Sequence, residues 1–182
     1  MESIRSIAVI GAGQMGRGIA QVAAAAGIDV VLSDVSVAHA EKGRATIASG
    51  LEKLVAKGKL DAAARDAQIA RIRPVDAIAS LGDCQLAVEA ATENLEIKLG
   101  ILRSVDERLP KGAILATNTS SISITKLAAA TGRPELVIGM HFMNPVPLMK
   151  LVEVIRGNDT ADATCALVDG WSKALGKIPD DA

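Results

Sequence analysis

Short apolar runs alternate along this chain with longer stretches in which apolar residues recur every three or four positions. Runs of four to eight apolar, often β-branched residues are typical of strands buried in a sheet, and the three- to four-residue spacing is typical of amphipathic helices. The predicted strands are residues 4–10, 29–32, 86–89, 113–117, 137–142 and 148–155. The predicted helices are residues 19–26, two helices within 37–73 that separate near 57–61, and residues 95–109, 123–130 and 161–175.

Strands that alternate with helices predict an α/β fold, a Rossmann-type doubly wound and mainly parallel sheet. Residues 37–73 would insert a helical hairpin into it, and residues 1–182 would form one domain. Residues 176–179 resemble the turn into one more strand, but Asp180, Asp181 and Ala182 stand in its place. We therefore expect no strand at that end.

Composition narrows the possible functions. The net charge is −1 and Phe142 and Trp171 are the only aromatic residues, so neither a phosphate backbone nor stacked bases are expected partners. Cys84 and Cys165 provide neither a disulfide framework nor, with the two histidines, a metal site. The N-terminus lacks the pattern of a signal peptide and no apolar run is long enough to cross a bilayer, which predicts a cytoplasmic protein without a membrane partner.

Residues 11–16, with Gly11, Gly13, Gln14, Met15 and Gly16, match the GxGxxG pattern of dinucleotide-binding loops. The pattern is specific here because a predicted strand precedes it and a predicted helix follows. Gly11 would permit the tight turn, Gly13 the approach of a pyrophosphate to the backbone, and Gly16 the close packing of helix on strand. The N–H groups at the start of the helix would bind the phosphates.

Asp34 ends the next predicted strand, about 20 residues further on. A carboxylate there accepts hydrogen bonds from the ribose hydroxyls of adenosine and repels the 2′-phosphate of NADP. The sequence therefore favours NAD, with FAD as the open alternative because it uses a similar loop. Residues 1–182 would then form one NAD-binding Rossmann domain.

His141 ends an apolar strand, and Glu153 lies within another. A carboxylate among apolar residues needs a partner, and a histidine one hairpin away would form a dyad suited to general-base chemistry. Residue patterns alone weigh this about equally against a structural histidine and a solvated glutamate. The other histidine, His39, lies in a polar helical stretch and is expected at the surface.

Two further polar residues follow strand ends. The prolines after His141 predict a rigid, extended segment that holds Asn144 in place. Ser120 follows the strand at 113–117, where spacing alone favours a cap for the next helix.

Four stretches taken together resemble the 3-hydroxyacyl-CoA dehydrogenase family, including the 3-hydroxybutyryl-CoA dehydrogenases. They are IAVIGAGQMGRGIAQVAAAAG, LAVEAATENLEIK, ILATNTSSISIT and GMHFMNPVPLMKLVEVI, in family order over essentially the whole chain. The resemblance implies an enzyme that oxidises (S)-3-hydroxyacyl-CoA to 3-oxoacyl-CoA with NAD, in fatty acid metabolism and β-oxidation.

The resemblance also implies roles for single residues. His141 would be the base, Glu153 would orient it, and Ser120 would bind the substrate oxygen, in place of the capping role. Asn144 would lie beside the nicotinamide and the reacting carbon. The implied cofactor contacts also include Glu93, Lys98, Asn118 and Ser120, although periodicity alone places Glu93 and Lys98 on a solvated helix face. Lys57 and Lys59 match the region that meets the CoA moiety.

Family members continue into a C-terminal helical domain for substrate binding and dimerisation, which is expected to be absent from residues 1–182. Full-length members are homodimers, and this chain is expected to be monomeric. Two alternatives stay open: a domain that binds NAD without catalysis, and a dehydrogenase of small free 3-hydroxyacids, whose other motifs this sequence lacks.

Overall fold

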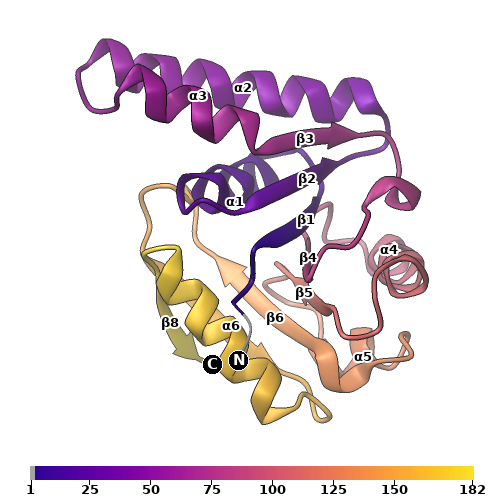
Figure 1. Ribbon diagram of the computed structural model, residues 1–182. Coiled ribbons are helices and arrows are strands. Elements are labelled where there is room, and N and C mark those ends of the chain that lie inside the picture. The colour runs from indigo at the N-terminus through magenta and orange to yellow at the C-terminus, as the bar shows by residue number, and fades with distance from the viewer. Residues whose placement is uncertain (1–2) are drawn as a thin grey trace.

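The computed structural model describes residues 3–182, whose strands form one eight-stranded sheet in the order β3-β2-β1-β4-β5-β6-β7-β8 (Figure 1). The strands are β1 (Ser6–Ile10), β2 (Asp29–Ser33), β3 (Ile72–Val75), β4 (Leu86–Glu89), β5 (Ile114–Thr117), β6 (Val137–Phe142), β7 (Leu151–Arg156) and β8 (Ile178–Asp181). The α-helices are α1 (Gln14–Ala25), α2 (Val37–Ala56), α3 (Ala62–Ala70), α4 (Leu95–Arg108), α5 (Ile124–Ala128) and α6 (Asp162–Ala174). Short 3₁₀ turns occupy Ile78–Ser80 and Pro134–Leu136.

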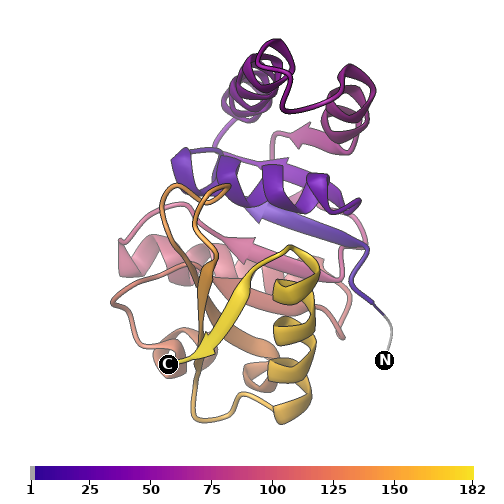
Figure 2. The ribbon, with the colours of Figure 1, turned by 90° about the vertical axis from the view of Figure 1, so that its left-hand side faces the viewer.

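The first six strands pair in parallel, whereas β7 is antiparallel to β6 and β8 is parallel to β7. This confirms the predicted Rossmann-type, mainly parallel sheet and the helical hairpin of α2 and α3, which projects from one end of the sheet (Figures 1 and 2). No helix among residues 3–182 combines the length and the apolarity that a membrane span requires.

Apolar side chains cover both faces of the sheet. Ile7 and Val9 of β1 pack with α1, α2 and α6, while Ala8 and Ile10 pack with α4 and α5. Successive strand residues point to opposite faces, so a strand buried on both sides is apolar throughout. That is why the central strands were predictable from short apolar runs.

The chain leaves β1 in one direction toward β2 and β3, and it returns to the other side of β1 to form β4. Ligands of open α/β sheets bind in the crevice beyond the carboxyl ends of the strands at such a switch point. The ends of β1 and β4 therefore mark where the site is expected.

Two edge strands contradict the sequence prediction. Strand β3 begins at Ile72, inside the stretch 37–73 assigned to the hairpin, and extends beyond it to Val75. Arg73 and Pro74 break its apolar pattern, and an edge strand tolerates both because one side of it pairs with no other strand among residues 3–182. Strand β8 forms despite Asp180 and Asp181, because backbone pairing with β7 needs no apolar side chains.

Two local predictions were also wrong. Helix α1 begins at Gln14 and not at residue 19 as predicted, so Gly16 and Gly18 lie inside it. The proline-rich segment after His141 is not extended: the N–H groups of Leu148 and Met149 both donate to Pro145 O, which closes a turn before β7 begins at Leu151.

Candidate active site

Gly11 turns the chain away from the end of β1. Its φ of +107° is a conformation that side chains disfavour, and a Cβ atom there would lie 2.6 Å from the carbonyl oxygen of Ala90. The N–H of Gly11 donates to Ser33 O at 2.8 Å, which joins the loop to the end of β2. The loop is thus held between the ends of β2 and β4.

The next two glycines meet different surroundings. A Cβ atom on Gly16 would lie 1.6 Å from Gly11 O, so α1 packs directly on the loop. A Cβ atom on Gly13 would meet nothing within 4 Å, and no side chain caps the helix at this N-cap residue. The backbone at Gly13 is therefore not covered by side chains, and no side chain caps the N–H groups of the first turn of α1. Such a surface fits a pyrophosphate.

Asp34 joins this loop from the end of β2. Its Oδ2 accepts the N–H of Ala12 at 2.7 Å and its Oδ1 accepts that of Val35 at 2.6 Å. The carboxylate borders a cavity of about 420 Å³ with largely apolar walls, which include Ile78 and Ile101. An apolar cavity beside a fixed carboxylate suits the adenine and ribose of a dinucleotide.

His141 and Glu153 stand directly opposite each other on the antiparallel strands β6 and β7. Nδ1 of His141 lies 2.8 Å from Oε2 of Glu153, and their side chains are 24% and 35% exposed. With the Nδ1 proton donated to the carboxylate, Nε2 presents a lone pair, as a general base requires. The structure thus brings together the two residues that the sequence paired.

Asn118 lies beside this pair. Its Oδ1 accepts the N–H of Phe142 at 2.9 Å, and its own N–H donates to Glu89 O at 2.8 Å. Asn118 therefore ties the carboxyl ends of β4, β5 and β6 together, including the residue that follows His141.

Ser120 and Asn144 are both exposed at this edge of the sheet. Ser120 follows β5, and Ser123 is the residue that caps α5, by accepting the N–H of Lys126. Asn144 borders a small cavity together with Gln14, so the turn after β6 reaches the first turn of α1. Both residues could touch a ligand that lies over the glycine loop.

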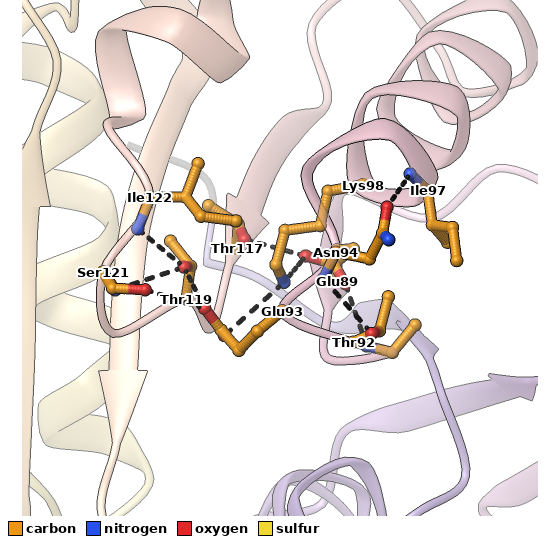
Figure 3. Close-up of polar contacts among 11 residues, drawn as sticks. Glu89, Thr92, Glu93, Asn94, Ile97, Lys98, Thr117, Thr119, Ser121 and Ile122 are labelled. Carbon is orange, nitrogen blue, oxygen red and sulfur yellow. Dashed lines mark hydrogen bonds and ion pairs between the residues drawn. The ribbon is translucent and has the colours of Figure 1, made fainter.

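Lys98 is buried, contrary to the solvated face that periodicity alone predicted. Its Nζ lies 2.6 Å from Oε2 of Glu89, and both side chains are 1% exposed (Figure 3). Glu93 is half exposed and accepts the hydroxyls of Thr119 and Ser121 at 2.9 and 3.2 Å. Sequence reasoning missed Glu89, although a carboxylate that ends a buried strand needs a partner just as Glu153 does.

Three predicted residues lie outside this edge. Lys57 and Lys59 are exposed at the tip of the hairpin, and α2 carries them about 30 Å along its axis from the end of β2. Their contact with a CoA moiety stays a prediction. His39 is exposed in the first turn of α2, as expected, and its Nδ1 lies 2.7 Å from Ser36 Oγ.

The bare glycine loop, the fixed carboxylate of Asp34 and the crevice at the switch point define a dinucleotide-binding Rossmann domain of the kind found in oxidoreductases. The profile of one family, described as "3-hydroxyacyl-CoA dehydrogenase, NAD binding domain", matches residues 6–180. The chain belongs to this family of 3-hydroxyacyl-CoA dehydrogenase NAD-binding domains, and its cofactor is NAD.

Similar proteins agree with this assignment. A 3-hydroxybutyryl-CoA dehydrogenase of Bradyrhizobium diazoefficiens is 50% identical over 96% of this chain and 59% of its own length. A 3-hydroxyadipyl-CoA dehydrogenase of Escherichia coli is 42% identical over 95% of this chain and 37% of its own length. The crystal structure of (S)-3-hydroxybutyryl-CoA dehydrogenase from Ralstonia eutropha matches with a TM-score of 0.96 and 49% identity, over 98% of this chain and 63% of that chain.

The chain spans at most about three fifths of the curated relatives described above, 59% for the Bradyrhizobium diazoefficiens protein. The activity and substrates of those whole proteins therefore come to this chain as proposals.

Proposed function

We propose that this chain carries the NAD site and the catalytic base of an enzyme that oxidises (S)-3-hydroxyacyl-CoA, for example 3-hydroxybutyryl-CoA, to 3-oxoacyl-CoA. The observation that carries the proposal is the 2.8 Å contact between His141 Nδ1 and Glu153 Oε2 at the edge of the sheet that also bears the glycine loop. The names of the similar proteins support the acyl-CoA substrate.

In this reaction the substrate loses a proton from its 3-hydroxyl and a hydride from C3. NAD held at the glycine loop would supply the hydride acceptor. Nε2 of His141 accepts the proton, because Glu153 holds the Nδ1 proton and leaves the Nε2 lone pair free. The carboxylate also stabilises the imidazolium that forms, so the charge created by proton transfer is balanced 2.8 Å away.

Other residues at the same edge would position the reactants. Exposed Ser120 would donate its hydroxyl to the substrate oxygen, and exposed Asn144 would lie beside the reacting carbon. The loop of Gly11, Gly13 and Gly16, with Asp34, would hold the dinucleotide through backbone N–H groups and the ribose hydroxyls. Lys57 and Lys59 would meet the CoA moiety.

A domain that binds NAD without turnover is the second candidate. The observation that favours it is the family match, which is to an NAD-binding domain and covers residues 6–180. The two candidates share the cofactor site and differ only in catalysis.

One set of measurements separates them. NADH binding is titrated with the 182-residue chain, and oxidation of NADH by acetoacetyl-CoA is assayed with this chain alone and with the chain joined to the C-terminal region of the Ralstonia eutropha enzyme. We expect the joined protein to turn over and His141→Ala to abolish turnover, whereas His39→Ala leaves it intact. Full activity of His141→Ala would exclude His141 as the base, and NADH binding without turnover in the joined protein would favour the second candidate.

Location and assembly belong to the same proposal. A cytoplasmic enzyme is supported by Cys84 and Cys165, which are both free thiols in the structure. The monomeric state of this chain, and the lack of nucleic-acid and membrane partners, stay predictions.

A further inference from the structure

The most deeply buried charges near the NAD site belong to Glu89 and Lys98. Oε2 of Glu89 accepts Lys98 Nζ at 2.6 Å and the hydroxyl of Thr117 at 2.8 Å, and its Oε1 accepts the N–H of Ala91 at 2.9 Å. Both carboxylate oxygens thus have partners, although the side chain is 1% exposed. Thr117 ends β5, Ala91 follows the end of β4, and Lys98 lies on the next helix, α4.

Glu89 is also the last residue of β4, at the switch point of the sheet. In register it stands beside Ile10 of β1 and Thr117 of β5. The residue after it, Ala90, donates its N–H to Ile10 O at 2.8 Å and is the residue that a side chain on Gly11 would strike. Glu89 therefore ends its strand directly beside the glycine loop.

A relay of polar contacts runs from Glu89 to the exposed edge, as Figure 3 shows. Lys98 Nζ lies 3.9 Å from Oε1 of Glu93, and Oε2 of Glu93 accepts the hydroxyls of Thr119 and Ser121. Ser120 stands between these two hydroxyl residues. The buried pair thus determines where Glu93 and the loop after β5 lie.

Stability alone gives little reason for such a pair. Two charges lose their hydration on burial, and well-packed apolar residues in their place often give a protein at least as stable. A buried pair whose carboxylate oxygens both have hydrogen-bond donors fixes geometry more strictly than apolar packing does. The relay ends at Thr119 and Ser121, which flank the exposed Ser120 that the proposed function assigns to the substrate oxygen.

We propose that Glu89 is a positioning residue of the NAD site: its carboxylate holds the Lys98 ammonium toward Glu93, and through them it sets the loop that carries Ser120. The proposal rests on the proposed function, because it assigns Glu89 to the same site. Glu89 touches neither cofactor nor substrate in this role; it acts through Lys98.

The test compares two ion pairs made by helix α4: the buried pair of Lys98 with Glu89, and the partly buried pair of Asp106 with Arg133. Glu89→Gln removes the charge from the pair at the start of α4, and Asp106→Asn removes it from the pair near its end, where Asp106 Oδ1 lies 2.6 Å from Arg133 Nε. NADH affinity is measured by fluorescence titration of the 182-residue chain, and stability by urea unfolding. We expect both variants to be less stable, and only Glu89→Gln to raise the Kd for NADH, by about tenfold or more.

A second comparison tests the route through Lys98. Lys98→Met and the double variant Glu89→Gln/Lys98→Met should bind NADH equally weakly, because Glu89 has nothing left to position. The double variant also leaves no unpaired buried charge, so it provides the measurement should Glu89→Gln fail to fold.

Each outcome decides the matter. An unchanged Kd in Glu89→Gln, an equal loss of affinity in Asp106→Asn, or additive losses in the double variant would overturn the role of Glu89 and leave the proposed function standing. If the unsubstituted chain bound no NADH, the proposed function itself would fall, and the role of Glu89 with it.

Discussion

His141 and Glu153 are direct cross-strand neighbours, with Nδ1 of the imidazole 2.8 Å from Oε2 of the carboxylate. Because β6 and β7 run antiparallel and exchange backbone hydrogen bonds, the rigid sheet sets this distance independently of any loop. A catalytic base built on strands keeps its orientation before substrate arrives.

This geometry predicts the effect of Glu153→Gln. An amide keeps the shape of the side chain but removes the charge that stabilises the imidazolium, so turnover of acetoacetyl-CoA by the joined protein should fall by about 10²–10⁴-fold. The Kd for NADH should stay within about twofold of the original, since Glu153 makes no contact with the glycine loop. Steady-state kinetics and NADH titration measure the two effects.

Asp180→Asn is the matched control. Asp180 lies beside Glu153 in register on β8, the parallel neighbour of β7 on the side away from His141. Its side chain is exposed and forms no ion pair with a histidine among residues 3–182. Its substitution should leave turnover unchanged. An equal loss in both variants would mean that the sheet edge as a whole, and not the carboxylate of Glu153, supports His141.

The sequence was sufficient for the parts of the fold that are buried on both faces. Strands such as β1 and β4 are apolar throughout because helices cover both sides, and the GxGxxG spacing located the switch point. Edge strand β8 has no buried side chain and is held mainly by backbone pairing, which leaves no mark on side-chain patterns. In edge strand β3, Arg73 and Pro74 separate the buried Ile72 from the buried Val75 and so interrupt the apolar run. Their absence from the prediction has these physical causes.

The site was predictable to a similar extent. The residue pattern alone weighed the pairing of His141 with Glu153 about equally against a structural histidine and a solvated glutamate, and the family resemblance decided for the pairing. The burial of Lys98 was missed. Lys98, Leu102 and Val105 stand at positions i, i+4 and i+7 on the buried face of α4, so the prediction of a solvated face for Lys98 misread this spacing. A charged residue on an apolar helix face needs a partner. The sequence alone does not show that Glu89 lies close enough to Lys98 to be that partner.

The glycine loop predicts that alanine at Gly13 weakens NADH binding, whereas alanine at Gly16 lowers the stability of the fold. Gly13→Ala places a methyl group in open space, so stability should change by no more than about 0.5 kcal/mol while the Kd for NADH rises at least about tenfold. Gly16→Ala places its methyl 1.6 Å from Gly11 O, which should cost about 3 kcal/mol or more of stability. Urea unfolding and NADH titration of both variants check this, and an unchanged affinity in Gly13→Ala would contradict a pyrophosphate at that position.

Asp34 predicts the choice of cofactor. Its carboxylate is fixed by the N–H groups of Ala12 and Val35, at the rim of the apolar cavity. Asp34→Asn should weaken NADH binding and relieve the repulsion of a 2′-phosphate, so the ratio of NADH to NADPH affinity should fall by about tenfold. Asp29→Asn, at the exposed opposite end of β2, is the control and should leave the ratio unchanged.

Cys84 predicts how stability depends on alkaline pH. Burial raises the pKa of its thiol from 9.0 to about 11; nearby Arg73 opposes this shift and Asp83 adds to it. The folded protein therefore keeps a proton that the unfolded chain loses above pH 9.0. This contribution to stability is fully present below that pH and is lost as pH rises toward about 11.

A shift of this size corresponds to about 2–3 kcal/mol, since one pKa unit is about 1.4 kcal/mol. The free energy of unfolding of the unsubstituted chain should therefore fall more steeply between about pH 8 and about pH 10.5 than that of Cys84→Ala, whose alanine binds no proton. Because every other titrating group is common to both proteins, the difference between the two curves isolates Cys84. Parallel curves would show that the unfolded chain and the folded protein hold this proton equally, and the thiol would then be as accessible in the folded state as in an open chain.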